Sequence, residues 1–134
     1  MVELEELKKR FLVEDAGTIE QDKLAELLER ILPLAVVDRS GFVSISQGDM
    51  ALRDKIQLVL SARYLAHALE EAVPVTVSVD ELVRMLREES KIVSARCSEL
   101  EADGFLTRPG RGVVQGRPFK VVDFIQNLPK QESH

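Results

Sequence analysis

The chain has little cysteine and histidine, and this limits the chemistry available to it. Cys97 is the single cysteine among 134 residues, so no disulfide can form within the chain. His67 and His134 are the two histidines, which is too few to complete a Cys/His zinc site. No D-x-D-x-D-G spacing or paired-carboxylate motif suggests a site for a hard cation. We therefore expect neither a metal nor another cofactor.

Long hydrophobic runs are also missing. No apolar run approaches the roughly 20 residues that a membrane-spanning helix needs. The first residues, with Glu3, Glu5, Lys8 and Arg10 among them, are too charged for the apolar core of a signal peptide. Hydrophobic residues make up 45% of the chain and charged residues 31%, which is close to the average for soluble globular proteins. These features predict a folded cytoplasmic protein with no membrane partner.

Motifs of nucleotide-binding and hydrolytic enzymes are absent as well. The sequence contains no G-x-x-x-x-G-K-[ST], G-x-G-x-x-G or G-x-S-x-G string. His67 falls on an expected helix, but no motif places a Ser, Cys or Asp to complete a catalytic group around it. The sequence therefore predicts that the protein is not an enzyme.

Positive charge is scarce overall but locally concentrated. The net charge is −5, and residues 1–49 hold 6 basic against 11 acidic residues, whereas residues 50–134 hold 12 of each. Residues 105–120 carry Arg108, Arg111, Arg117 and Lys120 and no carboxylate. Because phosphate binding depends on the distribution of basic residues and not only on their sum, this segment is a candidate basic patch.

The N-terminal third reads as a small module of two helices and a β-hairpin. Helical spacing of apolar residues between 2 and 12 predicts a first helix, which Gly17 would end. Thr18 to Gln21 form a capping box for a second helix, which Pro33 would stop. Two strand-like runs, 35–37 and 42–45, flank the turn-rich residues 38–41 and predict a hairpin. We expect this module to span residues 1–48.

Three helices follow in the second part of the chain. Asp49 is expected to cap a long helix with apolar residues from Leu52 to Leu69, which would join both parts into one body. Ser78 to Glu81 form a second capping box, preceded by a short valine-rich stretch. A third helix is expected from Ser90 to Asp103, closed by Gly104 in the left-handed position after the helix end.

A hairpin and an apolar tail complete the second domain, which we place at residues 49–128. Runs 105–108 and 119–122 are strand-like and predict a hairpin with a long glycine-rich loop between them. Phe124, Ile125 and Leu128 then either pack on the body or meet a partner, and residues 129–134 are expected to fray.

The order of three helices and a hairpin from residue 49 to 122 is that of a winged helix. Residues 93–108 resemble the recognition helix and first wing strand of archaeal and bacterial winged helix-turn-helix regulators, which commonly read Val-Ser-x-x-Leu-x-x-Leu-x-x-x-Gly-Leu-Val. The resemblance covers about 75 residues and departs from the family at Cys97, where leucine is usual. It implies an α+β, mainly α, fold: a winged helix-turn-helix of three helices and a hairpin wing, preceded by the small N-terminal module.

Helical geometry supports a surface for nucleic acid on the third helix. At 100° per residue, Val93, Cys97 and Leu100 share one face, and smaller polar residues occupy the other. A face of small residues lets a helix approach a major groove closely, and a cationic hairpin loop can follow the phosphate backbone. The predicted nucleic-acid-binding residues are Lys91, Ser94, Ala95, Arg96 and Ser98 on the helix and Arg108, Arg111, Arg117 and Lys120 on the hairpin.

Two functions remain open at this stage. One is a DNA-binding transcriptional regulator that acts as a homodimer, because one small winged helix reads too few base pairs for useful specificity. The other is a protein-interaction adaptor with an acidic N-terminal surface and no DNA binding. The first predicts that Arg111 and Arg117 lie on the side of Lys91 and Ser94, and the second predicts carboxylates there. Arg63, Arg84 and Arg87 either extend the patch or pair with carboxylates such as Glu81.

Overall fold

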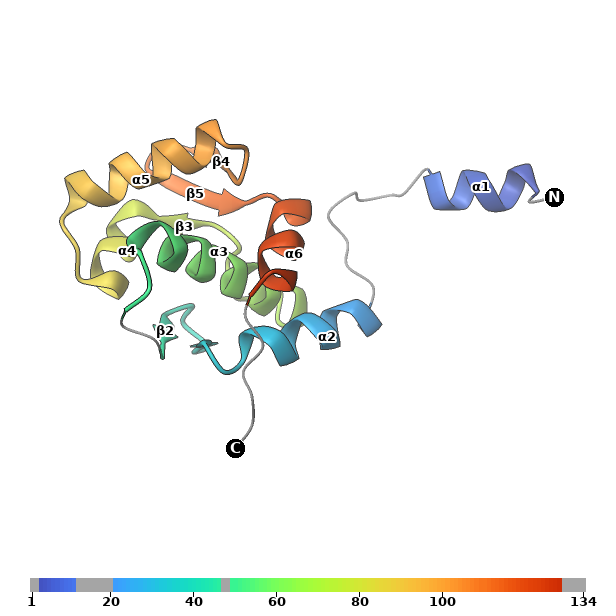
Figure 1. Ribbon diagram of the computed structural model, residues 1–134, viewed down its shortest axis with the longest axis horizontal. Coiled ribbons are helices and arrows are strands. Elements are labelled where there is room, and N and C mark those ends of the chain that lie inside the picture. The colour runs from blue at the N-terminus through green and yellow to red at the C-terminus, as the bar shows by residue number, and fades with distance from the viewer. Residues whose placement is uncertain (1–2, 12–20, 47–48, 129–134) are drawn as a thin grey trace.

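The computed structural model describes residues 3–11, 21–46 and 49–128 and is mainly helical, with two small sheets (Figure 1). This confirms the α+β, mainly α, class. The elements are α1 (Leu4–Phe11), α2 (Gln21–Ile31), β1 (Ala35–Val37), β2 (Val43–Ile45), α3 (Leu52–Leu69), β3 (Val77–Ser78), α4 (Val79–Leu86), α5 (Ser90–Ala102), β4 (Leu106–Gly110), β5 (Val113–Gly116) and α6 (Pro118–Gln126).

Helix α3 is the centre of the fold. In Figure 1 it runs through the middle of the view, with α5 and the β4–β5 hairpin on one side and α2 and β2 on the other. Residues 58–63 of α3 are all buried, as expected for a helix that is surrounded by other elements. Buried residues from both parts of the chain, such as Leu27, Val43, Leu82 and Ile125, belong to one continuous core cluster. The long helix thus joins the two parts as expected, and the division at residue 48 stays a prediction.

The first hairpin forms where the sequence predicted it. β1 and β2 pair antiparallel, with Val37 opposite Val43. In the turn, the Asp38 carboxylate accepts hydrogen bonds from the backbone N–H of Ser40 at 2.9 Å and of Phe42 at 3.0 Å. Gly41 has φ +96°, a backbone conformation that residues other than glycine rarely adopt. These local bonds reverse the chain between the two strands.

The second hairpin differs from the prediction. Residues 119–122 are not a strand but part of α6, and the second strand is β5, which pairs with β4 on one side and β3 on the other. The long glycine-rich loop was therefore also wrong, because a tight turn at Arg111 and Gly112 joins β4 to β5. Pro118 suits the first turn of a helix, where no backbone N–H is needed, and Val121 and Ile125 lie four residues apart on its buried face.

In residues 49–128, the predicted helix ends are confirmed in two of three cases. The Ser78 hydroxyl accepts a hydrogen bond from the Glu81 N–H at 3.0 Å, which confirms the cap of α4. Gly104 has φ +84°, and the Phe105 N–H donates to the Leu100 carbonyl at 2.9 Å, as in a Schellman motif. The Asp49 cap is wrong: the N-cap of α3 is Ala51, which has the extended backbone of that position and no side-chain bond.

The apolar tail packs on the body. Ile125 and Leu128 are buried in the core cluster, and Arg30 of α2 donates to the carbonyls of Gln126 and Leu128, both at 3.2 Å. These bonds satisfy carbonyls that the end of α6 would otherwise leave without a partner. The expected helix end at Gly17, residues 18–20 of the first capping box and the 129–134 tail lie outside the described residues. None of the described helices is long and apolar enough to cross a membrane.

Candidate nucleic-acid interface

Helix α5 separates a buried face from a small polar face, as its sequence predicted. Val93, Cys97 and Leu100 are completely buried in the core. On the opposite side Lys91, Ala95 and Ser98 are exposed and Ser94 is half-buried at the flank. We call these four residues, Lys91, Ser94, Ala95 and Ser98, the α5 stripe. The small side chains of Ser94, Ala95 and Ser98 leave the helix backbone accessible to the major groove of a duplex.

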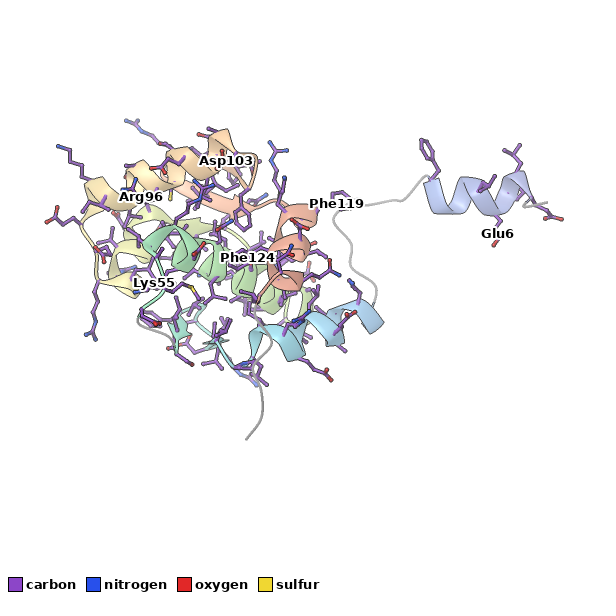
Figure 2. The ribbon with its side chains drawn as sticks, in the orientation of Figure 1. Glu6, Lys55, Arg96, Asp103, Phe119 and Phe124 are labelled. Atoms are coloured by element: carbon purple, nitrogen blue, oxygen red, sulfur yellow. The ribbon has the colours of Figure 1, made fainter. Side chains whose placement is uncertain are left out.

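Arg96 was predicted to belong to this surface, but it pairs with a carboxylate of its own helix. Its guanidinium forms an ion pair with Glu99, whose carboxylate also lies 3.7 Å from Arg53 of α3. Arg53 forms a second ion pair with Asp103, and that hydrogen bond raises the pKa of the Arg53 guanidinium. Figure 2 shows Arg96 and Asp103 along α5. These residues tie the C-terminal half of α5 to the start of α3.

Arg108 connects the β4–β5 hairpin to α5. Its Nε lies 3.2 Å from a carboxylate oxygen of Glu101, and its Nη2 donates to the Ser98 hydroxyl at 3.3 Å. Arg108 is thereby held beside the α5 stripe, and part of its charge is compensated by Glu101. The hairpin and α5 form one continuous surface at this point.

Arg111 occupies the exposed turn of the hairpin. The turn is anchored to the start of α4, because the Val79 N–H donates to the Gly112 carbonyl at 2.9 Å and Val113 pairs with Ser78. The structure thus replaces the predicted extended loop with a fixed turn. In the described part of the chain, no ion pair is found for Arg111 or for Lys91.

Arg117 and Lys120 lie at the other end of β5, so the predicted basic patch is divided. Arg117 is the N-cap of α6, and its backbone N–H donates to the Phe105 carbonyl at 2.8 Å. Lys120 lines a shallow depression together with Arg53 and Asp123. Arg111 precedes the turn residue Gly112 and Arg117 follows the last residue of β5, so a strand of 4 residues, about 13 Å long, lies between the two arginines. The prediction that these arginines share one loop was wrong because the intervening residues form a strand.

No protein-family model, curated protein or solved structure matches this chain. The functional assignment therefore rests on the residues of the chain itself.

The sequence suggests a surface position for Arg63, but the structure buries it. Its exposed fraction is 1%, so it cannot extend a surface patch. Its guanidinium donates to the carbonyls of Gly41 at 2.8 Å, Pro74 at 2.8 Å and Thr76 at 2.7 Å, and to the Glu81 carboxylate at 3.0 Å. Of the two alternatives for Arg63, pairing with a carboxylate is observed, with Glu81 as the partner, whereas the three carbonyl partners left no signal in the sequence.

The remaining candidate side chains have structural surroundings. Cys97 is fully buried, and burial raises the pKa of its thiol, so it serves as a small core residue. His67 places its Nδ1 at 2.7 Å from the Val73 carbonyl and so fastens the segment after α3. Over residues 3–11, 21–46 and 49–128, no group of three His, Cys, Asp or Glu side chains is arranged to hold a metal. Arg84 and Arg87 are exposed at the end of α4.

Proposed function

We propose that residues 49–128 form a winged helix-turn-helix domain that binds double-stranded DNA and acts as a dimeric transcriptional regulator. The observation that carries the proposal is the element order α3, β3, α4, α5, β4, β5 together with the strand order β3–β5–β4. In this arrangement α4 and α5 are consecutive helices, and α5 is the one that would enter the major groove. The resemblance of residues 93–108 to winged-helix regulators points to the same helix.

The α5 stripe and Arg111 are the proposed contact surface. Lys91, Ser94 and Ala95 lie in the N-terminal half of α5, which is the part of a recognition helix that usually approaches the bases. Arg111 at the hairpin turn is exposed and would contact a backbone phosphate.

The carboxylates of α5 bear directly on this proposal, because they would repel phosphate. Glu99 and Glu101 lie in the C-terminal half of the helix, and each is paired with an arginine, Arg96 and Arg108 respectively. We infer that these two arginines neutralise the carboxylates and do not themselves carry the DNA affinity. This assigns Arg96 and Arg108 a different role from the one that the sequence suggested.

A second candidate is a protein-interaction adaptor without DNA binding. Two observations favour it: the net charge of −5, and the carboxylates that accompany Arg96 and Arg108 on the α5 surface. A basic partner would then bind where we place the DNA.

A salt series of duplex binding tests the proposal. Fluorescence anisotropy with a random DNA duplex is measured for the wild type and for two double variants, each of which removes two exposed positive charges. We expect Lys91→Ala/Arg111→Ala to lower the slope of log K against log salt by about 0.9 for each lost phosphate contact. The matched control, Arg117→Ala/Lys120→Ala, should leave the slope near that of the wild type.

Each outcome distinguishes the candidates. Equal losses in both double variants would mean that affinity follows total charge, which would refute the proposed surface. No binding by the wild type even near 50 mM salt would favour the adaptor, because the phosphate term is strongest at low salt.

A further inference from the structure

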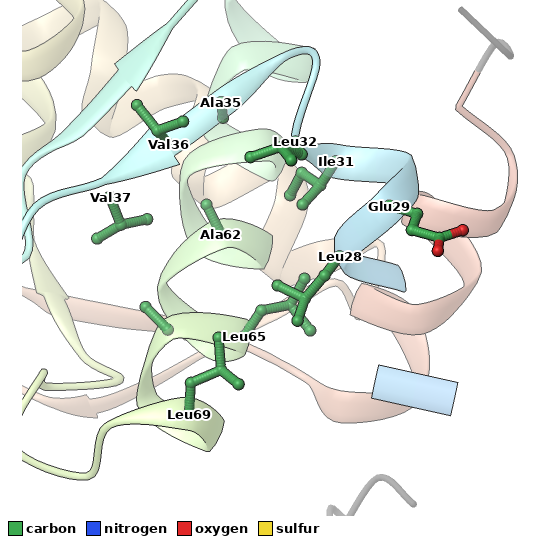
Figure 3. A pocket seen from close by; sticks show the side chains of 11 residues that line it. Leu28, Glu29, Ile31, Leu32, Ala35, Val36, Val37, Ala62, Leu65 and Leu69 are labelled. Atoms are coloured by element: carbon green, nitrogen blue, oxygen red, sulfur yellow. The ribbon is translucent and has the colours of Figure 1, made fainter. Parts of the chain in front are cut away.

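An apolar groove opens between α2, β1 and the second half of α3 (Figure 3). It has a volume of about 450 Å³, and its apolar lining includes Leu28, Leu32, Val36, Leu65 and Leu69. Leu32, Val36 and Leu69 are 64%, 53% and 60% exposed. Large side chains that are this exposed and this close together mark an interaction surface in soluble proteins.

Helix α1 presents a second apolar surface, which the other described residues of the chain leave exposed. Leu4, Leu7 and Phe11 follow the i, i+3, i+7 spacing of one helix face, and they are 78%, 46% and 85% exposed. Figure 1 shows α1 standing apart from the other elements. A helix of 8 residues is too short to be stable alone in water, so α1 needs a surface on which to pack.

We propose that α1 of one copy docks into the groove of a second copy, and that the exchange is reciprocal. The three apolar side chains of α1 match an apolar groove in chemistry. Charge complements this fit, because residues 8–10 of the sequence are all basic, whereas the exposed Glu29 of α2 lines the groove. The groove and the helix of one chain thus carry the two halves of one interface.

Interface size favours reciprocal exchange between two copies, and the length of the connecting segment allows it. Residues 12–20 can span at most about 30 Å, which allows α1 to reach a neighbouring molecule. A helix about 12 Å long buries too little surface for a specific complex, which typically buries about 1,200–2,000 Å². Reciprocal exchange doubles the contact and closes it around a two-fold axis.

This inference deepens the proposed function, because it names the interface of the proposed dimer. Only the purpose of the dimer rests on DNA binding; the exchange of α1 between two copies does not. Sedimentation decides the interface and the salt series decides DNA binding, so either can fail while the other stands. A monomeric wild type that still binds duplex DNA would overturn the exchange alone.

The test is the mass of the full chain by sedimentation equilibrium over a range of concentrations. The wild type should be a dimer. Leu7→Glu on α1 and Leu32→Glu at the groove should each weaken dimerisation about 100-fold or more, because each dimer loses two buried leucines. The control is Phe119→Glu, which changes a 72% exposed residue that points away from the body in Figure 2 and should leave the dimer intact.

Mixing the two weakened variants separates exchange from packing within one chain. Leu7→Glu retains an intact groove and Leu32→Glu retains an intact α1, so a mixed dimer regains one of its two helix–groove contacts. The mixture should associate more tightly than either variant alone. A monomeric wild type, a dimer that resists both substitutions, or a mixture that gains nothing would each overturn the proposal.

Discussion

Replacing Arg63 with methionine should destabilise the protein more than any other single arginine substitution in the described chain. Arg63 extends from α3 and donates hydrogen bonds to the turn of the first hairpin through Gly41, to the segment after α3 through Pro74 and Thr76, and to α4 through Glu81. Its side chain is 2% exposed. One guanidinium therefore holds three surrounding segments against the central helix.

The magnitude follows from the acceptors that lose their donor. Leaving a buried acceptor unsatisfied costs about 1–3 kcal/mol; the bond to the Gly41 carbonyl is buried, whereas those to the Pro74 and Thr76 carbonyls are part-buried and each contribute less. The Glu81 carboxylate adds less, because its side chain is 33% exposed and water can replace part of the interaction. Removing a buried charge recovers some desolvation cost, so we expect a net loss of about 4 kcal/mol in the free energy of unfolding. This is a large part of the 5–15 kcal/mol that stabilises a typical domain.

Urea unfolding measures this loss. With a slope of about 2 kcal/mol per molar urea, the midpoint of Arg63→Met should fall by about 2 M. Arg84→Met is the matched control, because it removes the same charge from an exposed position on α4 and should change stability by less than about 0.5 kcal/mol. If Arg63→Met lost no more than this control, the reasoning from its four hydrogen bonds would be refuted.

A double-mutant cycle isolates the contact with the hairpin turn. A Cβ added to Gly41 would lie 2.9 Å from the Arg63 guanidinium carbon, and the φ of +96° disfavours any side chain. Gly41→Ala should therefore cost less in the Arg63→Met background, where the close contact is gone and only the backbone strain remains. Purely additive losses would contradict a direct contact between the two residues.

Three further predictions concern the core and the titrating groups. Gly116→Ala should lower the free energy of unfolding, measured with urea, by about 1–3 kcal/mol, because the added Cβ would lie 2.6 Å from a methyl of buried Val121. The control Gly110→Ala should lose less, because its Cβ would come no closer than 3.3 Å to a neighbouring atom. Equal losses in the two variants would contradict the packing argument. The hydrogen bond from Ser40 holds the pKa of Asp38 below its usual value, so its stabilising contribution is present above about pH 4 and is lost as the pH falls through the lowered pKa. Asp38→Asn should thus lower the melting temperature at neutral pH and reduce its decline between neutral and acidic pH, whereas an unchanged pH profile would contradict this. The Cys97 thiol, buried and with a raised pKa, should react with a thiol reagent rapidly in urea and only slowly in buffer, and rapid reaction in buffer would contradict its burial.

The sequence by itself determined the elements whose signals are local. Apolar spacing located α2, α3 and α5, and the turn chemistry of residues 38–41 located the first hairpin. The Ser78 cap and the left-handed Gly104 also followed from single residues and their immediate neighbours. Such features depend on backbone conformations and bonds within a few residues, so a short stretch of sequence contains what is needed to predict them.

Only the tertiary structure decided the features that depend on distant partners. Residues 113–116 form the central strand of the sheet because β4 pairs with them on one side and β3, more than 30 residues earlier, on the other, and residues 119–122 belong to the helix that covers α3. The same pairing divides the basic segment, so that Arg111 and Arg117 lie at opposite ends of β5. Arg63 reads as a surface charge until the carbonyls of three other segments surround it. Strand pairing and the burial of a charge both need groups that the chain brings together only on folding, and local sequence patterns do not specify them.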